Sequence, residues 1–201
     1  MHFFIHVKKR FPFLWKFIED INGYLVKWLY SDNIQQQAQL ILEDYKNEPV
    51  EYRLINRDEL DDLHNLLSGQ DTEQLKYFNP HSFDPTTLQR LYDNSCFLML
   101  GVYDNKHLIG YFFLRCFVNK TCFVGKLVDR AYQGRGIAKR MGKIAQNIAW
   151  SSGFRVFGTS SKHNVKSLNS SKATNDFKLI RELADNYIYY EYLQSGEKTL
   201  H

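Results

Sequence analysis

A glycine-containing turn in the middle of the chain could bind an anion. It reads Gln133-Gly134-Arg135-Gly136-Ile137-Ala138-Lys139 and stands directly before a predicted helix. The first N–H groups of a helix have no partner inside the helix, and the helix dipole adds partial positive charge at that end. Because Gly136 has no Cβ, the backbone can approach a phosphate closely, and Arg135 and Lys139 add positive charge. The spacing therefore predicts a site for a phosphate-bearing cofactor.

A strand and a helix must hold this turn in place. Residues 122–128, before the turn, are rich in β-branched and aromatic residues and predict a strand. After the turn, apolar residues recur on a 3.6-residue period, which predicts an amphipathic helix. These residues are Ile137, Met141, Ile144, Ala145 and Ile148. The turn therefore joins the end of a strand to the start of a helix.

Two common phosphate motifs do not fit this turn. A dinucleotide-binding G-x-G-x-x-G would need a glycine where Lys139 stands, and no P-loop G-x-x-x-x-G-K-[ST] is present. The segment instead reads Q-x-x-G-x-A, which resembles the pyrophosphate loop [QR]-x-x-G-x-[GA] of the GNAT superfamily of acyl-CoA-dependent N-acetyltransferases. Other segments also resemble the family, so that the likeness covers roughly residues 50–193. They are Ile109-Gly110-Tyr111 at the third strand, Asn164-Val165-Lys166-Ser167 after the fifth strand, and Phe177 at the start of the sixth strand.

The pattern from residue 50 onwards predicts the order β, α, α, β, β, β, α, β, α, β, β. Asn56 with Glu59, and Asp84 with Pro85, are typical of helix starts, and residues 68–83 are expected to be an irregular connection. The resemblance implies an α/β (α+β) fold, with a mixed, mostly antiparallel central sheet of about seven strands flanked by helices. We expect this domain to span residues 49–195, with a tail at 196–201.

Residues 1–48 are expected to form an N-terminal helical extension of two helices, from Pro12 to Tyr30 and from Ser31 to about Tyr45. The expected inward residues of the first helix are Leu14, Phe17, Ile18, Ile21, Leu25, Trp28 and Leu29. Those of the second are Ile34, Ala38, Ile41 and Tyr45. Charges at Lys16, Glu19, Asp20 and Lys27 argue against a membrane span. Docking on the domain or on a second copy is favoured, and an interfacial helix on an anionic membrane is the alternative.

Composition narrows the class of protein. The chain has 201 residues, a formal net charge of +4, 44% hydrophobic residues and 24% charged residues, which are globular values. This mild charge permits an anionic cofactor but does not indicate nucleic-acid binding. The three cysteines have no metal-ligand spacing, so no metal is expected, and they indicate a reduced, cytoplasmic location. Cys116 and Cys122 could face each other across a hairpin, and buried thiols are the favoured interpretation.

The resemblance implies where acetyl-CoA, the co-substrate, would lie. The backbone around Leu127 and Val128, on a fourth strand that splays from the fifth, would pair with the pantetheine amides. The turn from Gln133 to Lys139 would hold the pyrophosphate. Asn164 and Ser167 would contact the cofactor from the far side, although a helix cap with a first-turn serine explains both residues equally well.

Acetyl transfer to an amine needs a neutral nucleophile, stabilisation of the oxyanion and a proton for the leaving thiolate. Many relatives carry a glutamate on the fourth strand as the base, but residues 122–128 contain no carboxylate, and Lys126 could suit an acidic group on the substrate. His81, which titrates near neutral pH, is the alternative base, and a surface or turn-stabilising histidine is the competing interpretation. In many relatives a tyrosine protonates the thiolate, and its position falls near Ser171 or Lys172 here. Ser171 could donate a proton or a hydrogen bond to the sulfur, and a helix-surface serine is the competing interpretation.

The sequence therefore predicts an acetyl-CoA-dependent N-acetyltransferase acting by direct transfer in a ternary complex. The expected acceptor is a small-molecule amine, with an amino sugar as the narrower hypothesis. Two alternatives stay open: acetylation of a peptide or protein amine, and a non-catalytic acyl-CoA sensor that uses its N-terminal helices to contact a partner.

Overall fold

A seven-stranded sheet forms the centre of the molecule. The computed structural model describes residues 12–194, and side chains from residue 19 onwards. The strand order is β1-β2-β3-β4-β5-β7-β6, and all neighbours are antiparallel except β4 and β5, which are parallel. The strands are β1 (Glu51–Leu54), β2 (Phe97–Asp104), β3 (His107–Cys116), β4 (Thr121–Val128), β5 (Arg155–Ser161), β6 (Phe177–Glu182) and β7 (Tyr187–Tyr192).

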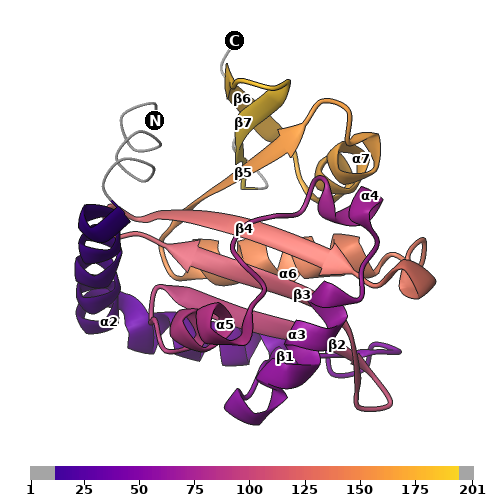
Figure 1. Cartoon of the computed structure of the whole chain (residues 1–201), viewed down its shortest axis with the longest axis horizontal. Helices are drawn as coiled ribbons and strands as arrows, with labels where there is room; N and C mark the ends of the chain where they lie inside the picture. The colour runs from indigo at the N-terminus through magenta and orange to yellow at the C-terminus, as the bar shows by residue number, and fades with distance from the viewer. Residues whose placement is uncertain (1–11, 195–201) are drawn as a thin grey trace.

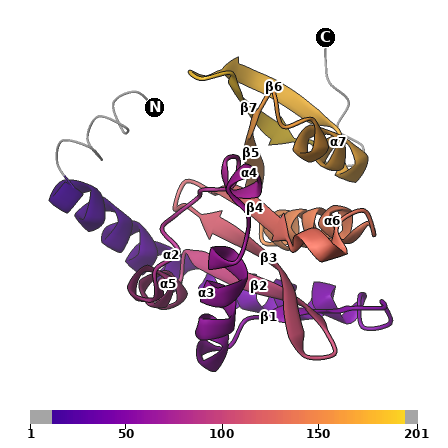
Figure 2. The same cartoon turned by 45° about the vertical axis from the view of Figure 1, so that its right-hand side comes forward.

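Helices cover both faces of this sheet (Figures 1 and 2). They are α2 (Pro12–Glu43), α3 (Leu60–Ser68), α4 (Thr72–Leu75), α5 (Pro85–Tyr92), α6 (Ile137–Ser151) and α7 (Val165–Thr174), with 3-10 turns η1 (Arg57–Glu59) and η2 (Arg130–Tyr132). On one face, α2 and α6 contribute the buried residues Val26, Ile34, Ala38, Met141, Ile144 and Ile148. On the other face, α3 and α5 contribute Leu60, Leu63, Leu66, Leu67 and Leu88. Strands β2 and β3 are therefore covered on both faces, which is why they read as nearly continuous apolar runs.

The predicted strands and helices of residues 50–193 are confirmed, and their caps are those that the sequence indicated. Asn56 and Glu59 form a capping box, and the Asp84 side chain accepts a hydrogen bond from the Thr87 N–H group. The connection at residues 68–83 is more ordered than predicted. It contains the four-residue helix α4, which begins because the Asp71 side chain accepts from the Gln74 N–H group at 2.8 Å.

The prediction of two N-terminal helices is wrong. Helix α2 runs without interruption from Pro12 to Glu43. Ser31, the expected boundary, is accommodated inside the helix because its hydroxyl donates to the carbonyl of Lys27 at 2.8 Å. No helix of the described residues is both long enough and apolar enough to cross a membrane.

The predicted inward face of the first half of α2 is also wrong. Ile21, Trp28 and Leu29 are 44%, 76% and 44% exposed, whereas Val26 is fully buried. Polar anchoring decides this orientation, because the Asn22 side chain donates to the Cys116 carbonyl and accepts from the Val118 N–H group. In the second half, Ile34 and Ala38 are buried and Ile41 and Tyr45 pack against the core, as predicted. The side chains of Leu14, Phe17 and Ile18, and the tail at 196–201, lie outside the described residues.

Cys116 and Cys122 face each other across β3 and β4, as expected. Their sulfur atoms are 3.6 Å apart, and both residues are buried free thiols. Burial raises the pKa of Cys122 well above its ordinary value, so this thiol stays protonated in the core.

Candidate functional site

Strands β4 and β5 separate after a short paired region and leave one edge of β4 open. They pair only from Thr121 to Phe123 on β4 and from Arg155 to Phe157 on β5. On the other edge of β4, the Phe117 N–H group donates to the Thr121 carbonyl, and the Asp129 N–H group donates to the Ile109 carbonyl. The backbone polar groups of an antiparallel strand alternate in direction. Residues 124, 126 and 128 therefore direct their backbone groups towards the open cleft.

This alternation refines the predicted backbone contacts. Leu127 lies opposite Tyr111 and directs its backbone groups to β3. Lys126 and Val128 direct theirs into the cleft, although the Val128 carbonyl already accepts from the amides of Gln74 and Gln133. The open backbone donors next to Leu127 are thus the N–H groups of Lys126 and Val128.

The glycine turn forms an open cradle at the start of α6. Gly134 and Gly136 have φ angles of +80° and +78°, in the left-handed region that favours glycine, and Gly136 is the N-cap of the helix. A Cβ at Gly134 would meet no atom within 4 Å, and one at Gly136 would meet only the Arg140 guanidinium, at 2.9 Å. Among the described residues, no N–H group of residues 134–138 has an acceptor. Five consecutive donors are therefore available to an anion.

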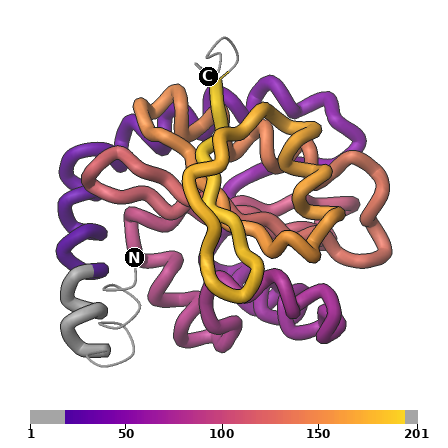
Figure 3. Tube along the Cα trace, turned by 90° about the horizontal axis from the view of Figure 1, so that it is seen from above, coloured from indigo at the N-terminus to yellow at the C-terminus, as the bar shows by residue number. Residues whose placement is uncertain are grey.

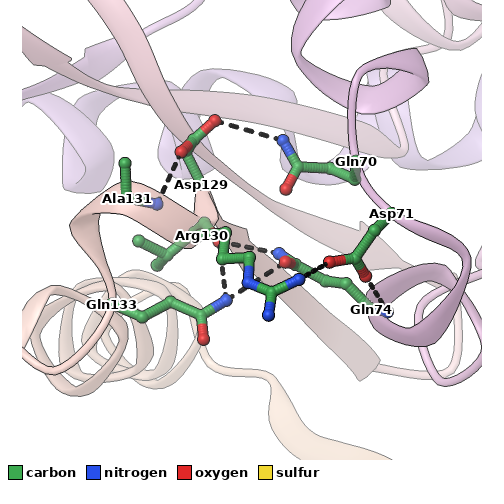
Figure 4. Close-up of polar contacts among 8 residues, drawn as sticks. Gln70, Asp71, Gln74, Asp129, Arg130, Ala131 and Gln133 are labelled. Carbon is green, nitrogen blue, oxygen red and sulfur yellow. Dashed lines mark hydrogen bonds and ion pairs between the residues drawn. The ribbon is translucent and has the colours of Figure 1, made fainter.

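Side chains from α4 brace this turn (Figure 4). The Gln133 amide donates to the Gln74 side chain at 3.2 Å and to the Val128 carbonyl at 3.3 Å. Arg130 forms an ion pair with Asp71, the N-cap of α4. The role of Gln133 is therefore visible in its contacts: its side chain ties the turn to the end of β4 and to α4.

The basic side chains near the turn differ in their availability. The Arg140 guanidinium is paired with Glu48 at 2.6 Å. Arg135 donates to the Ala131 carbonyl at 3.2 Å and lies over the Tyr132 ring, while Lys139 is exposed. Arg135 and Lys139 can therefore both supply positive charge beside the five backbone donors. Ile137 is buried and anchors the first turn of α6, and Ala138 is half-buried.

Asn164 and Ser167 form the N-terminal cap of α7. The Asn164 side-chain oxygen accepts from the Ser167 N–H group at 3.1 Å, so the capping role is confirmed. Both residues are half-buried, and helix α7 packs against α6. A contact of these residues with a cofactor stays a prediction.

A cavity of about 580 Å³ lies on the α3–α5 side of the sheet and reaches the point where β4 and β5 separate. Its walls come from the α4–α5 connection and from β2, β3, β4, β5 and β7, and half of the residues that line it are aromatic. The aromatic residues include Tyr77, Phe97, Phe113, Phe117, Phe123 and Tyr187. Figure 3 shows the β6–β7 hairpin, in yellow, extending to the side of the molecule where the magenta helices lie. Tyr187, the first residue of β7, is one of the residues that line the cavity.

The cavity wall has no room for a side chain at the centre of β4. Gly125 occupies the central position of β4 in the cavity wall. A Cβ at Gly125 would lie 2.4 Å from the nearest atom of the Phe113 ring. The aromatic ring therefore fills the space that a side chain at residue 125 would need.

His81 lies behind the aromatic wall. Its Nδ1 is 2.8 Å from the Ser82 carbonyl, which can only accept, so Nδ1 carries the proton and Nε2 accepts from the Tyr111 hydroxyl at 3.2 Å. The ring packs against Phe83, Phe97, Tyr111 and Phe113. Burial, and to a lesser extent the nearby Arg115 charge, lowers the pKa of His81 below 6.5. His81 is thus a neutral imidazole at neutral pH, and its one lone pair is held by Tyr111.

Ser171 is not a helix-surface serine. It is buried at 2% exposure on the inner side of α7, where the Tyr192 hydroxyl donates to it at 2.9 Å and the Tyr190 hydroxyl lies 3.4 Å away. Burial raises the pKa of Tyr192 well above its ordinary value, so this hydroxyl stays protonated. The Ser171 oxygen accepts from Tyr192, and the serine hydroxyl can donate its own proton to the Tyr190 oxygen or to another acceptor.

Lys126 does not face the cavity. Its ammonium donates to the Ser170 hydroxyl on α7 at 3.1 Å, on the α6 side of the sheet, and burial lowers its pKa to about 8. The expectation that Lys126 meets an acidic group of the acceptor is therefore wrong, because residue 126 has the opposite facing to Gly125. The basic residues that line the cavity are Lys76 and Arg115.

The sequence interpretation missed the hydroxyl partners of Ser171 and the cavity wall. A signal for the wall was present, because Tyr111 and Phe113 alternate on β3 and Phe123 lies on the neighbouring strand β4, but no role was assigned to them from the sequence. Among the described residues, no group of three or more histidine, cysteine or acidic side chains could hold a metal ion.

Residues 60–170 match the model of the acetyltransferase (GNAT) family. No curated protein matches the chain. A structure of ribosomal-protein-S5-alanine acetyltransferase from Vibrio fischeri is similar with a TM-score of 0.63 and 20% identity, covering 76% of this chain and 97% of that chain.

Two further solved structures share the fold. Spermidine N-acetyltransferase from Vibrio cholerae, in complex with CoA and spermine, has a TM-score of 0.62 and 18% identity, covering 73% of this chain and 96% of that chain. Aminoglycoside acetyltransferase AAC(6′)-Ib, in complex with coenzyme A and kanamycin, has a TM-score of 0.57 and 12% identity, covering 73% of this chain and 95% of that chain.

Proposed function

The chain belongs to the acetyltransferase (GNAT) family, and we propose that it transfers the acetyl group of acetyl-CoA to a primary amine of a small molecule. The observation that carries the proposal is the row of five unpaired N–H groups at residues 134–138, placed beside the open edge of β4. An anion-binding cradle next to a row of free backbone donors suits a ligand that has both a pyrophosphate and an amide-containing arm.

The residues present fit acetyl-CoA. Residues 134–138 would hold the pyrophosphate, with Arg135 and Lys139 beside it, and the backbone N–H groups of Lys126 and Val128 would pair with the arm. Asn164 and Ser167 would contact the cofactor from α7. When bound, acetyl-CoA supplies an activated acetyl thioester.

We propose His81 as the general base. Its folded-state pKa lies below 6.5, so it is unprotonated at neutral pH and can accept a proton at Nε2. That nitrogen is held by Tyr111, and the base role requires this hydrogen bond to be exchanged for one from the acceptor amine or from a water.

We propose Ser171 as the donor to the leaving sulfur. Tyr192 donates to the Ser171 oxygen, which leaves the serine hydroxyl proton able to point elsewhere. The tyrosine therefore orients the serine, and the serine supplies the proton or hydrogen bond.

Calorimetric titration with acetyl-CoA, followed by an assay of CoA release with a panel of amines, tests the proposal. We expect saturable binding and amine-dependent CoA release. If acetyl-CoA binds but no amine increases CoA release, the protein is an acyl-CoA sensor and not an enzyme. Two observations favour that alternative: β4 has no carboxylate, and Tyr111 occupies the Nε2 atom of His81. If acetyl-CoA does not bind, both the acetyltransferase proposal and the acyl-CoA sensor alternative are refuted.

The finer assignments are further proposals. We propose an amino sugar as the acceptor, with peptide or protein amines as the alternative. We also propose residues 49–195 as the catalytic domain of a cytoplasmic protein and residues 1–48 as an extension that contacts a second copy or a membrane surface. Exposed apolar residues on α2 support this contact, and they are Ile21, Tyr24, Trp28 and Leu29. Sedimentation and liposome flotation of the full chain and of a Trp28→Glu variant test it.

A further inference from the structure

The charged groups of the aromatic cavity are basic. Among the described residues, the side chains that line it include Lys76 and Arg115 but no aspartate or glutamate. An ammonium group that enters this cavity therefore meets no carboxylate on its walls. A substrate with several positive charges would be repelled by both cations in a partly desolvated space.

The Arg115 guanidinium has hydrogen-bond donors that make no bond to any described residue. Only its Nη2 has a hydrogen-bond partner among the described side chains, namely Glu19 of α2 at 2.5 Å. Glu19 also contacts Arg90, at 3.6 Å, so one carboxylate is shared between two guanidinium groups. The guanidinium carbon of Arg115 also lies over the Phe117 ring, 5.3 Å from its centroid. The guanidinium is therefore oriented but not saturated, which suits a carboxylate or phosphate ligand.

The aromatic part of the cavity wall is suited to binding a ring of the ligand. Phe97 and Phe113 stack at 4.7 Å, and Phe123 stacks on Tyr189 beside the opening of the sheet. Aromatic faces bind the apolar side of a ring, and the guanidinium at their margin sets the orientation of an acidic group.

We propose that the acceptor is an anionic amine: a primary amine on a ring-containing body that also carries a phosphate or carboxylate, which Arg115 binds with help from Lys76. The inference rests on the proposed acetyltransferase function and specifies its substrate class. It separates this chain from the spermidine and aminoglycoside acetyltransferases that share its fold, because spermine and kanamycin are polycations.

Matched pairs of amines test the proposal on the intact protein. One pair is glucosamine 6-phosphate and glucosamine, and the other is phenylalanine and phenethylamine, so that each pair differs by its acidic group. Spermidine is the polycationic comparison. We expect the anionic member of at least one pair to have about tenfold higher affinity and kcat/KM, in line with one hydrogen bond to a charged group. The pair that shows the effect identifies phosphate or carboxylate as the ligand.

Variants locate the effect. In Arg115→Gln the advantage of the anionic amine should fall to about twofold or less, whereas Arg90→Gln, which also contacts Glu19 but does not line the cavity, should retain it. The proposal would be overturned if the wild type used the amine without an acidic group equally well or better in both pairs. Preferred use of spermidine over the anionic amines, or an anion advantage that survives in Arg115→Gln, would also overturn it.

Binding of the same amines to the free protein, measured calorimetrically, keeps this test separate from that of the proposed function. Loss of acetyl-CoA binding would refute the acetyltransferase proposal and leave the charge preference of the cavity measurable. Absence of any anion preference in these titrations would refute the substrate class alone.

Discussion

The cofactor half of the candidate site is formed by backbone groups, whereas the acceptor half is formed by side chains. The cofactor side consists of backbone donors from one continuous segment, residues 126–138, whose directions follow from a strand, two glycines and a helix start. The acceptor side consists of side chains from the α4–α5 connection and five strands. A backbone site is insensitive to most substitutions except those that add a Cβ or a charge. A side-chain cavity can change its ligand through one residue.

The largest effect should come from placing a negative charge in the backbone cradle. We expect Gly136→Glu to weaken acetyl-CoA binding on the order of 10³-fold, because it opposes the pyrophosphate and costs at least two hydrogen bonds to a charged group. Calorimetric titration measures the loss.

Gly153→Glu is the matched control. Gly153 has a φ of +81° and follows the other end of α6, so this variant introduces the same charge and the same backbone strain away from the cradle. Similar losses of affinity in both variants would show that the effect is strain rather than position.

Much of the fold was predictable because its signals are local. Asn56 with Glu59, Asp84 with Pro85, and Gly136 before Ile137 each act within one helical turn, and the strands between them read as apolar runs. The orientation of α2 was not predictable, because the contacts of Asn22 with the backbone of residues 116 and 118 join segments about 95 residues apart. The sequence shows an apolar stripe that contains Ile21 and Trp28, but it does not show that the hydrogen bonds of Asn22 place this stripe on the solvent side.

The same distinction applies to the site. The cradle at residues 134–138 could be identified from seven consecutive letters. The surroundings of Ser171 could not, because Tyr190 and Tyr192 approach it only when β7 pairs beside β5. Lys126 was assigned to the acceptor side because the sequence does not show which face of the sheet each side chain of β4 occupies. A shift of one residue along the strand moves a side chain to the opposite face.

The second largest effect tests the side-chain half of the comparison. If His81 is the base, His81→Ala should lower kcat by about 10²-fold. In the wild type, kcat/KM should fall as pH decreases through the folded-state pKa of His81, which lies below 6.5. The variant should lose this part of the pH profile. An unchanged profile in an active His81→Ala protein would exclude His81 as the base.

His81 also links stability to pH. Its pKa is lower in the folded protein than in the unfolded chain, so the unfolded chain binds more protons between the two pKa values. The contribution of His81 to stability is therefore present at neutral pH and decreases as pH falls below about 6.5. Denaturant titrations at pH 7.5 and 5.5 should show a smaller pH difference for His81→Gln than for the wild type.

A smaller effect is expected at Ser171. Ser171→Ala should lower kcat by about tenfold, the value of one hydrogen bond of about 1.4 kcal/mol, with little change in acetyl-CoA affinity. Tyr192→Phe should reproduce part of this loss, because it removes the donor that orients the serine. A loss confined to acetyl-CoA affinity, with kcat unchanged, would assign the cluster to packing between α7 and β7.

The smallest effect separates the two roles of Asn164. Asn164→Ala removes an N-cap and should destabilise the fold by about 1 kcal/mol, measured by denaturant titration. Asn164→Asp retains the cap, since a carboxylate also accepts from the Ser167 N–H group, but it brings a negative charge to the side of the cleft formed by α7. If Asn164 also contacts acetyl-CoA, the aspartate variant should bind it a few-fold more weakly at unchanged stability. Unchanged affinity in both variants would make Asn164 a cap alone, and would confine recognition of the cofactor's anionic part to the backbone donors of residues 134–138.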